Sequence, residues 1–399
     1  MHLIIDCTTT QNQLKYNGIG QYTRHIVSRL IQNPNLDITL LLFNGESTLD
    51  PYIKGSSAKV YRLGKLRISD YKNIIWYIFK ILPAIKQVRR EDSIYFCPYF
   101  WGGIPSLHIP TVLAVHDFIL PKFNIYSEKS FLHNIIRGIQ YWLEMFKARY
   151  CKAIVTCSKH TAHDFVSYFP KYPRRNIHVI YLDGEVKESD DMTWEEKMPK
   201  DYKERGYFIY MGGALSKSKN SEGVIRGYRN FIGRVGNSKR VPYLVIAGKN
   251  FTKDVDSKVV CFKNKVKDLG IKENVTFFGF YEDTQVKPLL NNSIAFIHLS
   301  LYEGFGISLV EALKSKAPVI AHNGTCYPEV LGDGGLLVNG MDEKDVGKAM
   351  YKLYTDNKLR EELIEKGTQR GKLFSWDIAV RKTIEVFKEV SSNISIYTK

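Results

Sequence analysis

The sequence predicts an α/β protein built from two doubly wound parallel sheets. Short apolar runs alternate with amphipathic helical stretches along the chain, and this alternation restarts after residue 206. Continuous apolar strands separated by helices are typical of parallel strands that are buried on both faces. The chain has 399 residues, which favours two domains, since single domains mostly contain about 100–200 residues.

The first half of the chain contains a regular series of expected strands and helices. We expect strands at residues 3–5, 37–43, 93–96, 111–115, 153–156 and 178–181. Helices are expected between them, near residues 21–32, 71–90, 129–150 and 159–168. Because parallel strands need such crossover connections, this order predicts a first parallel sheet within residues 1–182.

The composition changes at residues 183–206, which hold nine acidic and five basic residues. We interpret this segment as a linker or an exposed excursion. A second domain is assigned to residues 207–375, where the pattern of strands and helices resumes. Its strands are expected at residues 207–211, 243–247, 275–278, 295–298, 318–321 and 335–338, with helices at 221–235 and 308–314.

The composition bounds the class of protein. The chain is 44% hydrophobic and 25% charged, which excludes a disordered protein. A formal net charge of +16 indicates an anionic partner: nucleic acid, an anionic membrane surface or a phosphorylated ligand. Neither a secretory signal nor a spanning segment is expected, and the six scattered cysteines form no Cys-x-x-Cys pair. We therefore expect a cytoplasmic location and no metal site built from cysteines.

Two glycines precede the first long helix. Gly18 and Gly20 stand at the expected start of that helix, where free backbone N–H groups and the helix dipole suit a phosphate group. The loop before them, residues 8–17, is long and lacks the GxGxxG spacing. A plain turn is therefore the alternative interpretation.

The strongest local motif follows the strand that ends at Ser300. A loop with Gly304 and Gly306 leads into a helix that starts near residue 307. This order places Glu303 at the carboxyl edge of a parallel sheet, where open α/β sheets bind ligands. Glu311 lies in the first turns of the helix and can reach toward the same ligand.

The chemistry of this motif suits a nucleotide sugar. Carboxylates accept hydrogen bonds from sugar hydroxyls, whereas the backbone N–H groups of a glycine-rich loop suit phosphate. The alternative is structural: Glu303 would cap the helix and Glu311 would be solvated.

The segment that contains Glu303 and Glu311 resembles a motif of a known family. EGFGISLVEALKSKAPVIA, residues 303–321, resembles the Glu-x7-Glu signature of the family-4 retaining glycosyltransferases of the GT-B fold. Further segments match in order, from the GIGQYTR helix start to FSWDIAV near the C-terminus. They include AVHDF (114–118), VTCSKHTAHDF (155–165), YMGGALSKSKN (210–220), VTFFGFYED (275–283) and YPEVLGDGGLLV (327–338). The resemblance implies two Rossmann-like domains facing a cleft, with a last helix, residues 376–399, packing back on the first domain.

The resemblance assigns roles in binding the donor. Glu311 resembles the carboxylate that holds the ribose hydroxyls. Glu303, with the backbone N–H groups of Gly304, Phe305 and Gly306, resembles the group that holds the donor sugar. The aromatic side chains of Phe280 and Tyr281 are expected to lie beside the base of the donor.

The resemblance also assigns two residues near the reacting bond. His116 resembles the histidine that contacts the sugar, with a core histidine as the alternative. Lys219 resembles the lysine that binds the diphosphate, with a solvated lysine as the alternative. Many relatives carry an arginine in this phosphate loop, where this chain has Ala214 and Ser218, and Lys217 is the residue that could substitute.

No metal or separate cofactor is implied, because the nucleotide sugar is itself the co-substrate. The motif Asp254-Val255-Asp256 is interpreted as a solvated loop. Helix dipoles, backbone amides and Lys219 would neutralise the leaving diphosphate. The family implies retention of configuration, and no sequence feature identifies a covalent nucleophile.

The first domain carries the features expected of an acceptor side. Residues 51–182 hold a net charge of +13. Residues 69–90 combine aromatic, apolar and basic side chains as interfacial helices do, although a buried helix broken at Pro83 would look similar. We expect contact with an anionic membrane or with a polyprenyl-diphosphate-linked acceptor, and no nucleic acid partner.

These observations lead to one functional expectation. The chain should be a retaining, metal-independent hexosyltransferase, with mannose from GDP-mannose as the expected donor and a saccharide or lipid-linked saccharide of bacterial O-antigen-like synthesis as acceptor. A UDP- or dTDP-sugar enzyme of the same fold is one alternative. A non-catalytic GT-B partner subunit or an anionic-polymer-binding protein is another.

Overall fold

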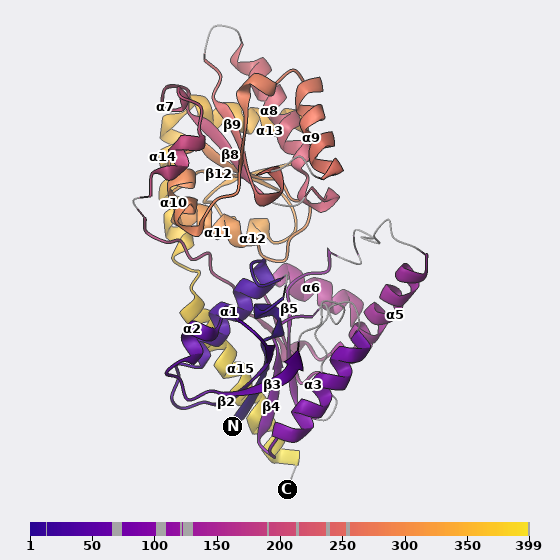
Figure 1. Ribbon diagram of the computed structural model, residues 1–399. Helices are drawn as coiled ribbons and strands as arrows, with labels where there is room; N and C mark the ends of the chain where they lie inside the picture. The colour runs from indigo at the N-terminus through magenta and orange to yellow at the C-terminus, as the bar shows by residue number, and fades with distance from the viewer. Residues whose placement is uncertain are drawn as a thin grey trace. The chain divides into compact units, whose positions relative to one another are not determined.

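The computed structural model forms two compact units, and each is described by itself. Unit 1 comprises Met1–Leu182 and Trp376–Lys399, and unit 2 comprises Asp183–Ser375. The structure describes all residues except 13, 66–73, 101–108, 120–121, 123–130, 190, 213–214, 237–239, 253–255 and 398–399. The predicted fold class is confirmed, because the two units contain parallel sheets of seven and six strands (Figure 1).

The sheet of unit 1 has the strand order β3-β2-β1-β4-β5-β6-β7. The central strands are buried along their whole length and are mostly apolar, as is typical of strands covered on both faces. The strands are β1 (His2–Asp6), β2 (Asp37–Asn44), β3 (Lys59–Lys65), β4 (Ser93–Cys97), β5 (Thr111–Val115), β6 (Ala153–Thr156) and β7 (Ile177–Val179).

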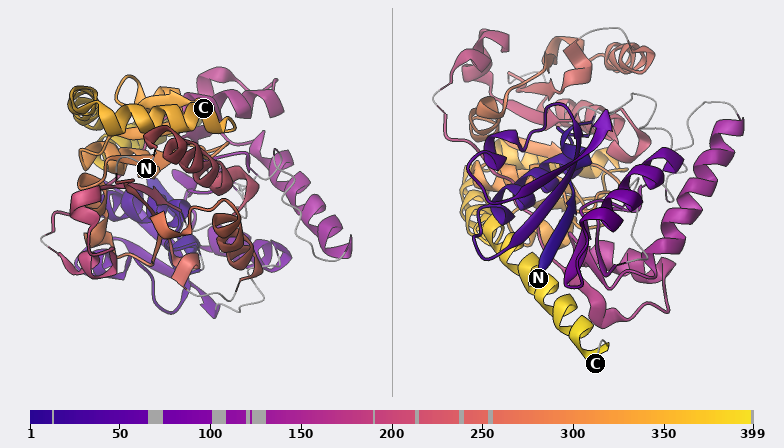
Figure 2. Two further views of the ribbon diagram at one scale, coloured as in Figure 1. Left: turned by 90° about the horizontal axis from the view of Figure 1, so that it is seen from above. Right: turned by 60° about the horizontal axis from the view of Figure 1, so that its bottom comes forward.

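Right-handed crossovers divide the helices of unit 1 between the two faces of this sheet. The chain leaves β1 in one direction and β4 in the other, so α1 covers one face while α3, α5 and α6 cover the opposite face (Figures 1 and 2). The helices are α1 (Gly18–Leu30), α2 (Asp50–Ile53), α3 (Ile74–Val88), α5 (Phe131–Ala148) and α6 (Lys159–Tyr168).

The last helix, α15 (Trp376–Tyr397), belongs to unit 1 although unit 2 precedes it in the sequence. It packs against α1, β4 and β6. The Trp376 ring stacks on the His25 ring of α1 at 4.7 Å between centroids, and Phe387 meets Phe96 of β4 edge-on at 5.2 Å. Buried aromatic contacts therefore hold this helix to the first sheet.

Strand β3, the short helix α2 and helix α3 differ from the sequence expectations, and β7 ends at Val179, two residues before its expected end. Strand β3 was not predicted, because it lies at the edge of the sheet and buries only Leu63, so it lacks a continuous apolar run. Helix α3 continues through Pro83 instead of breaking there. It buries Ile81 and Ile85 and exposes Phe79, so the described part has two distinct faces. The start of this segment, residues 69–73, lies outside the described residues.

The sheet of unit 2 has the order β10-β9-β8-β11-β12-β13. All six of its strands begin and end within one residue of the predicted bounds, because their apolar runs are short and uninterrupted. The strands are β8 (Tyr207–Met211), β9 (Tyr243–Ala247), β10 (Val275–Gly279), β11 (Ala295–His298), β12 (Val319–His322) and β13 (Leu336–Val338).

The helices of unit 2 also follow the crossover rule. Helices α8 and α9 follow β8 and β9, α13 packs against α8, and α11 packs against α10 and α14. The helices are α7 (Tyr202–Arg205), α8 (Ser221–Val235), α9 (Ser257–Asp268), α10 (Asp283–Asn291), α11 (Ile307–Lys314), α12 (Tyr327–Leu331), α13 (Glu343–Thr355) and α14 (Asn357–Gly371).

The acidic segment 183–206 lies within unit 2. Trp194 is fully buried and packs edge-on against Tyr202, while Tyr202 in turn meets Tyr207 of β8. The segment therefore contributes aromatic side chains to the core of unit 2, which its charged composition did not indicate. Among the described residues, no helix combines the length and the apolar composition that crossing a membrane requires.

Candidate active site

The sheet of unit 2 has a topological switch point between β8 and β11. The chain moves from β8 toward β9 and β10, and from β11 toward β12 and β13, so the connections diverge at this pair of strands. Ligands of open α/β sheets bind beyond the carboxyl ends of the strands at such a point. The loop after β8 carries Lys219, and the loop after β11 carries Glu303.

Lys219 and Glu303 form an ion pair at this point, between Lys219 Nζ and Glu303 Oε1. The Glu303 side chain is 15% exposed, and that of Lys219 is 31% exposed. Burial alone would raise the pKa of Glu303, but the charge and hydrogen bond of Lys219, together with His298 and a hydrogen bond from Ser300, hold the pKa below its ordinary value. The structure therefore brings together two predicted site residues that are 84 positions apart, with Glu303 ionised.

Backbone contacts fix the two loops to each other. Leu301 N donates to Ser218 O at 2.7 Å, directly joining the two segments. Asn220 adopts the left-handed conformation, with φ at 49°, and its Nδ2 donates to Leu299 O at 3.2 Å and to Gly340 O at 2.8 Å. These bonds position the neighbouring Lys219. Sequence reasoning missed this role of Asn220, because its partners are distant in sequence.

The glycine loop leads into α11. Gly306 is the N-cap and has a φ of 82°, a conformation that favours glycine. Phe305 is 3% exposed and meets Phe374 edge-on at 5.5 Å, so its side chain anchors the loop in the core. Gly304 is buried between Glu303 and this anchor. The backbone N–H groups at the start of α11 therefore lie beside Glu303, as an anion site requires.

Glu311 lies on the second turn of α11 and is largely buried. Burial, together with the charges of Asp283 and Asp183, raises its pKa to about 7. The chain passes close to it at Gly184, where an added Cβ would lie 2.5 Å from Glu311 N. Asp183 also forms an ion pair with Lys314 of the same helix. No local pattern predicted this close approach, because residues 183–206 resembled a linker.

The remaining predicted residues of unit 2 lie around this edge. Phe280 directly follows β10 and is 45% exposed, and its carbonyl accepts a hydrogen bond from Lys197 Nζ at 2.8 Å. Burial and the charge of Glu311 raise the pKa of Tyr281, which places that side chain near Glu311. Lys217 is exposed and forms no ion pair within the described part of the chain.

Two predicted features fall on undescribed residues. Ala214 of the phosphate loop lies outside the described residues, as do Asp254 and Val255 of the Asp-x-Asp motif. Asp256, the remaining member, is the N-cap of α9 and accepts a hydrogen bond from Lys258 N at 2.9 Å.

His298 is a buried residue beside Glu303 that the sequence analysis missed. It is the last residue of β11, and its Nε2 lies 3.8 Å from Glu303 Oε1. Burial lowers its pKa to about 4. At the end of an apolar strand a histidine resembles a core residue, and no local pattern distinguishes it.

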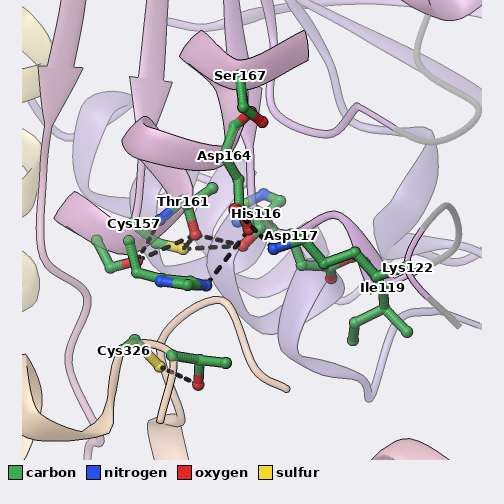
Figure 3. A network of polar contacts seen from close by, with 12 residues as sticks. His116, Asp117, Ile119, Lys122, Cys157, Thr161, Asp164, Ser167 and Cys326 are labelled. Carbon is green, nitrogen blue, oxygen red and sulfur yellow. Dashed lines mark hydrogen bonds and ion pairs between the residues drawn. The ribbon is translucent and has the colours of Figure 1, made fainter. Parts of the chain in front are cut away.

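His116 of unit 1 follows β5. Its Nε2 donates to Pro98 O at 2.8 Å, and its ring meets the Tyr22 ring of α1 edge-on at 4.5 Å. Burial lowers its pKa to about 4, so the ring is neutral near pH 7. The His116 carbonyl accepts from Cys157 Sγ at 3.1 Å and from Thr161 Oγ1 at 3.3 Å (Figure 3). The residue is thus fixed at the carboxyl edge of the first sheet.

The neighbours of His116 have local structural roles. Asp117 Oδ1 accepts a hydrogen bond from Ile119 N at 3.0 Å, which caps the turn after β5. Lys122 Nζ contacts Asp164 Oδ1 at 2.7 Å, and this pair ties the same turn to α6 (Figure 3). These contacts hold the segment that carries His116.

Gly18 and Gly20 occupy the first turn of α1. Gly18 is exposed at the first helical position. Gly20 is buried, and a Cβ at this residue would lie 2.2 Å from Leu14 O. Close packing of the preceding loop therefore explains why a glycine is needed at residue 20. The helix start at the exposed Gly18 remains a possible binding position for an anion.

Comparison with known sequences divides the chain as the structure does. A family model described as "Glycosyltransferase Family 4" matches residues 16–182, and one described as "Glycosyl transferases group 1" matches residues 192–370. The chain is 24% identical over 402 residues to the O-antigen chain mannosyltransferase B of Escherichia coli. That alignment covers 94% of this chain and 97% of the relative.

Solved structures share the two-sheet fold. WaaG, a glycosyltransferase involved in lipopolysaccharide biosynthesis, aligns with a TM-score of 0.67 at 14% identity, over 96% of this chain and 99% of that chain. HepE of Anabaena, in complex with UDP-glucose, aligns with a TM-score of 0.70 at 13% identity, over 99% of each chain.

Proposed function

The chain belongs to the family-4 glycosyltransferases, a retaining family of the GT-B fold, and from this premise we propose that it transfers a hexose from a nucleoside diphosphate sugar to a saccharide or lipid-linked saccharide. The observation that carries this proposal is the Lys219–Glu303 pair at the switch point of unit 2. An ammonium group there can meet a diphosphate, while the adjacent carboxylate can accept from sugar hydroxyls.

Different residues of unit 2 would bind the diphosphate, the sugar, the ribose and the base of the donor. Lys219 and the backbone N–H groups at the start of α11 would hold the diphosphate. Glu303 would accept hydrogen bonds from the sugar, and Glu311 from the ribose. Phe280 would lie beside the base, since it is exposed at the end of β10. Lys217 would add a second positive charge at the phosphates.

The proposed reaction is a displacement on one face of the sugar. The acceptor oxygen forms a bond to the anomeric carbon while the bond from that carbon to the diphosphate oxygen breaks. The hydroxyl proton passes to the departing phosphate oxygen, so no protein nucleophile is needed. Lys219 and the α11 N-terminus would stabilise the charge that develops on the diphosphate, without a divalent ion. His116 would contact the sugar from unit 1.

GDP-mannose is the donor that we propose. The O-antigen mannosyltransferase of Escherichia coli supports mannose, because the alignment covers nearly all of both chains. A UDP-sugar is the second candidate, supported by the UDP-glucose complex of HepE. The exposed Phe280 offers a stacking surface that suits either base.

We place the acceptor on unit 1, at an anionic membrane surface in the cytoplasm. Helix α5 exposes Ile139 and Trp142, the latter by 61%, and Tyr150 is exposed in the turn directly after the helix. Arg149 stacks on the Phe146 ring of this helix at 4.1 Å. Apolar and basic groups on one helix face favour anionic lipid. Co-sedimentation should therefore be stronger with anionic than with neutral vesicles, and equal binding would contradict this placement.

A ligand panel tests the proposed donor. Thermal unfolding is measured with GDP-mannose, UDP-glucose, dTDP-glucose and ADP-glucose, each with and without EDTA. A bound donor stabilises the native state by about 2.7 kcal/mol at a hundredfold excess over its Kd. We expect the largest shift with GDP-mannose and no effect of EDTA. A larger shift with UDP-glucose would support the second candidate.

Transfer assays test the catalytic proposal against a non-catalytic subunit or an anionic-polymer-binding protein. Glu303→Ala and Glu311→Ala should both abolish transfer from the donor that binds. Glu361→Ala is the matched control, since Glu361 is an exposed glutamate on α14 of the same unit. Wild-type turnover in both site variants would refute the proposal that the chain is an enzyme.

A further inference from the structure

His298 is a buried histidine whose ring nitrogens are unsatisfied. The residue is 5% exposed, and neither Nδ1 nor Nε2 has a hydrogen-bond partner within the described part of the chain. Buried polar atoms are nearly always paired in native proteins, so an unpaired ring nitrogen calls for a partner that is absent from this state.

Aromatic neighbours hold the ring beside Glu303. Its centroid lies 5.5 Å from that of Phe296 and 5.3 Å from that of Tyr327, with Tyr327 edge-on. Nε2 lies 3.8 Å from Glu303 Oε1, which is beyond a hydrogen bond by less than 1 Å. A small movement of the carboxylate would close this distance.

Lys219 holds the same oxygen of Glu303. Under the proposed function, this ammonium must also meet the diphosphate of the donor. A more strongly charged partner would draw the ammonium away from Oε1, and the largely buried carboxylate would then lose its charged partner and keep only the hydrogen bond from Ser300. His298 Nε2, which lies 3.8 Å from Oε1 and has no hydrogen-bond partner among the described residues, can supply the missing contact.

We propose that His298 is a positioning residue that donates a hydrogen bond from Nε2 to Glu303 Oε1 when a bound diphosphate engages Lys219. The exchange keeps the Glu303 carboxylate aimed at the donor sugar while Lys219 serves the phosphates. The low pKa of His298 agrees with this role, because a neutral ring keeps one N–H to donate. The inference rests on the proposed function and names a residue outside its assigned site.

Two substitutions separate donation from packing. His298→Phe keeps a flat ring in the aromatic cluster but removes the donor, whereas His298→Gln keeps an N–H group. We expect His298→Phe to lower kcat by about 10–100-fold, the range for losing a hydrogen bond to a charged group, with KM for the donor nearly unchanged. His298→Gln should recover most of this loss.

His178→Phe is the matched control. His178 Nε2 also lies 3.8 Å from a glutamate oxygen, that of Glu389, but the pair belongs to unit 1 and is partly exposed. This variant should keep the wild-type kcat and KM. The free nucleoside diphosphate should bind the wild-type chain and His298→Phe equally, which shows that the variant keeps its fold.

A spectroscopic measurement completes the test. Nitrogen-15 NMR of labelled histidine should show the His298 proton on Nε2, with a hydrogen-bond shift that appears on adding the nucleoside diphosphate. Unchanged kcat in His298→Phe, or equal losses in the Phe and Gln variants, would overturn the inference while leaving the proposed function intact. A wild-type chain that turns over no nucleotide sugar would overturn both.

Discussion

Each unit has a carboxyl group at the switch point of its sheet, on a different strand in each unit, and the two groups are held differently. In unit 1, the connections diverge at β1 and β4, and Asp6 ends β1 at that switch point. Asp6 is fully buried and accepts hydrogen bonds from Thr8 N at 3.0 Å, Thr8 Oγ1 at 2.7 Å, Tyr99 at 3.2 Å and Tyr95 at 3.3 Å. In unit 2, Glu303 is partly exposed and is held by Lys219.

The pKa directions express this difference. Burial raises the pKa of Asp6 to about 6, because its hydrogen bonds compensate only in part. The pKa of Glu303 lies below its ordinary value despite burial, because the charge and hydrogen bond of Lys219 act together with His298 and a hydrogen bond from Ser300. At the sheet edge of unit 1, hydrogen bonds from the chain itself satisfy the carboxyl group of Asp6. At the sheet edge of unit 2, the carboxylate of Glu303 depends on a cation that a ligand can also bind. The same topology thus provides a closed edge in one unit and an open edge in the other.

The largest expected effect comes from removing the shared cation. Lys219→Ala should lower transfer by roughly 10²–10³-fold, the range for losing one preorganised group that stabilises developing charge. Initial rates at saturating donor measure this loss. Lys272→Ala, an exposed lysine of the same unit, should retain the wild-type rate. A Lys219→Ala enzyme within a few fold of wild type would mean that the open edge does not serve the diphosphate.

Asp6→Ala should act on stability instead of on the donor. It removes the carboxylate acceptor of the buried Tyr95 hydroxyl and one of the partners of Tyr99, which keeps Thr8 Oγ1 at 2.9 Å, at a cost of about 1–3 kcal/mol in the free energy of unfolding. Urea denaturation near pH 7 measures this loss, and the Kd for the nucleotide sugar should stay unchanged. A weakened Kd with unchanged stability would reverse the assignment of the two edges.

Donor affinity should depend on pH through Glu311. Its pKa of about 7 means that ionisation falls about tenfold from pH 8 to pH 6. If the carboxylate accepts from the ribose, Kd for the nucleotide sugar should rise by up to that factor as the pH falls. Glu311→Gln should remove the dependence. His116 and His298, each with a pKa of about 4, do not titrate in this window.

The stability contribution of Glu311 has the opposite sign. Its pKa is raised on folding from 4.5, so the native state binds a proton that the unfolded chain releases. Its contribution therefore weakens as the pH rises from about 4.5 to 7. Affinity and stability should move in opposite directions, and a parallel fall of both below pH 7 would contradict the assignment.

The sequence predicted the parts of the site that local order determines. Glu303 and Glu311 follow from a strand, a glycine loop and a helix in succession. The pairing of Glu303 with Lys219 depends on β8 and β11 being neighbours, which element order alone does not specify. His298 resembled a core residue, and Gly184 lay in a segment whose charge indicated a linker. Contacts between distant segments, not local patterns, determine these roles.

Lys217 gives the smallest expected effect and the finest test of the open edge. It lies two residues before Lys219 on the same short 3-10 helix, but it is exposed, whereas Lys219 is partly buried beside Glu303. An exposed charge is screened by solvent and salt, so Lys217→Ala should weaken donor binding only about two- to fivefold, and less at 0.5 M salt.

Lys217→Arg should bind the donor at least as tightly as wild type, because a guanidinium group can contact phosphate through two parallel hydrogen bonds. Calorimetric titration with the nucleotide sugar at two salt concentrations measures both effects. A loss as large as that of Lys219→Ala would show that the diphosphate lies outside the Lys219–Glu303 pair, and the comparison between the two edges would then have to be drawn around Lys217.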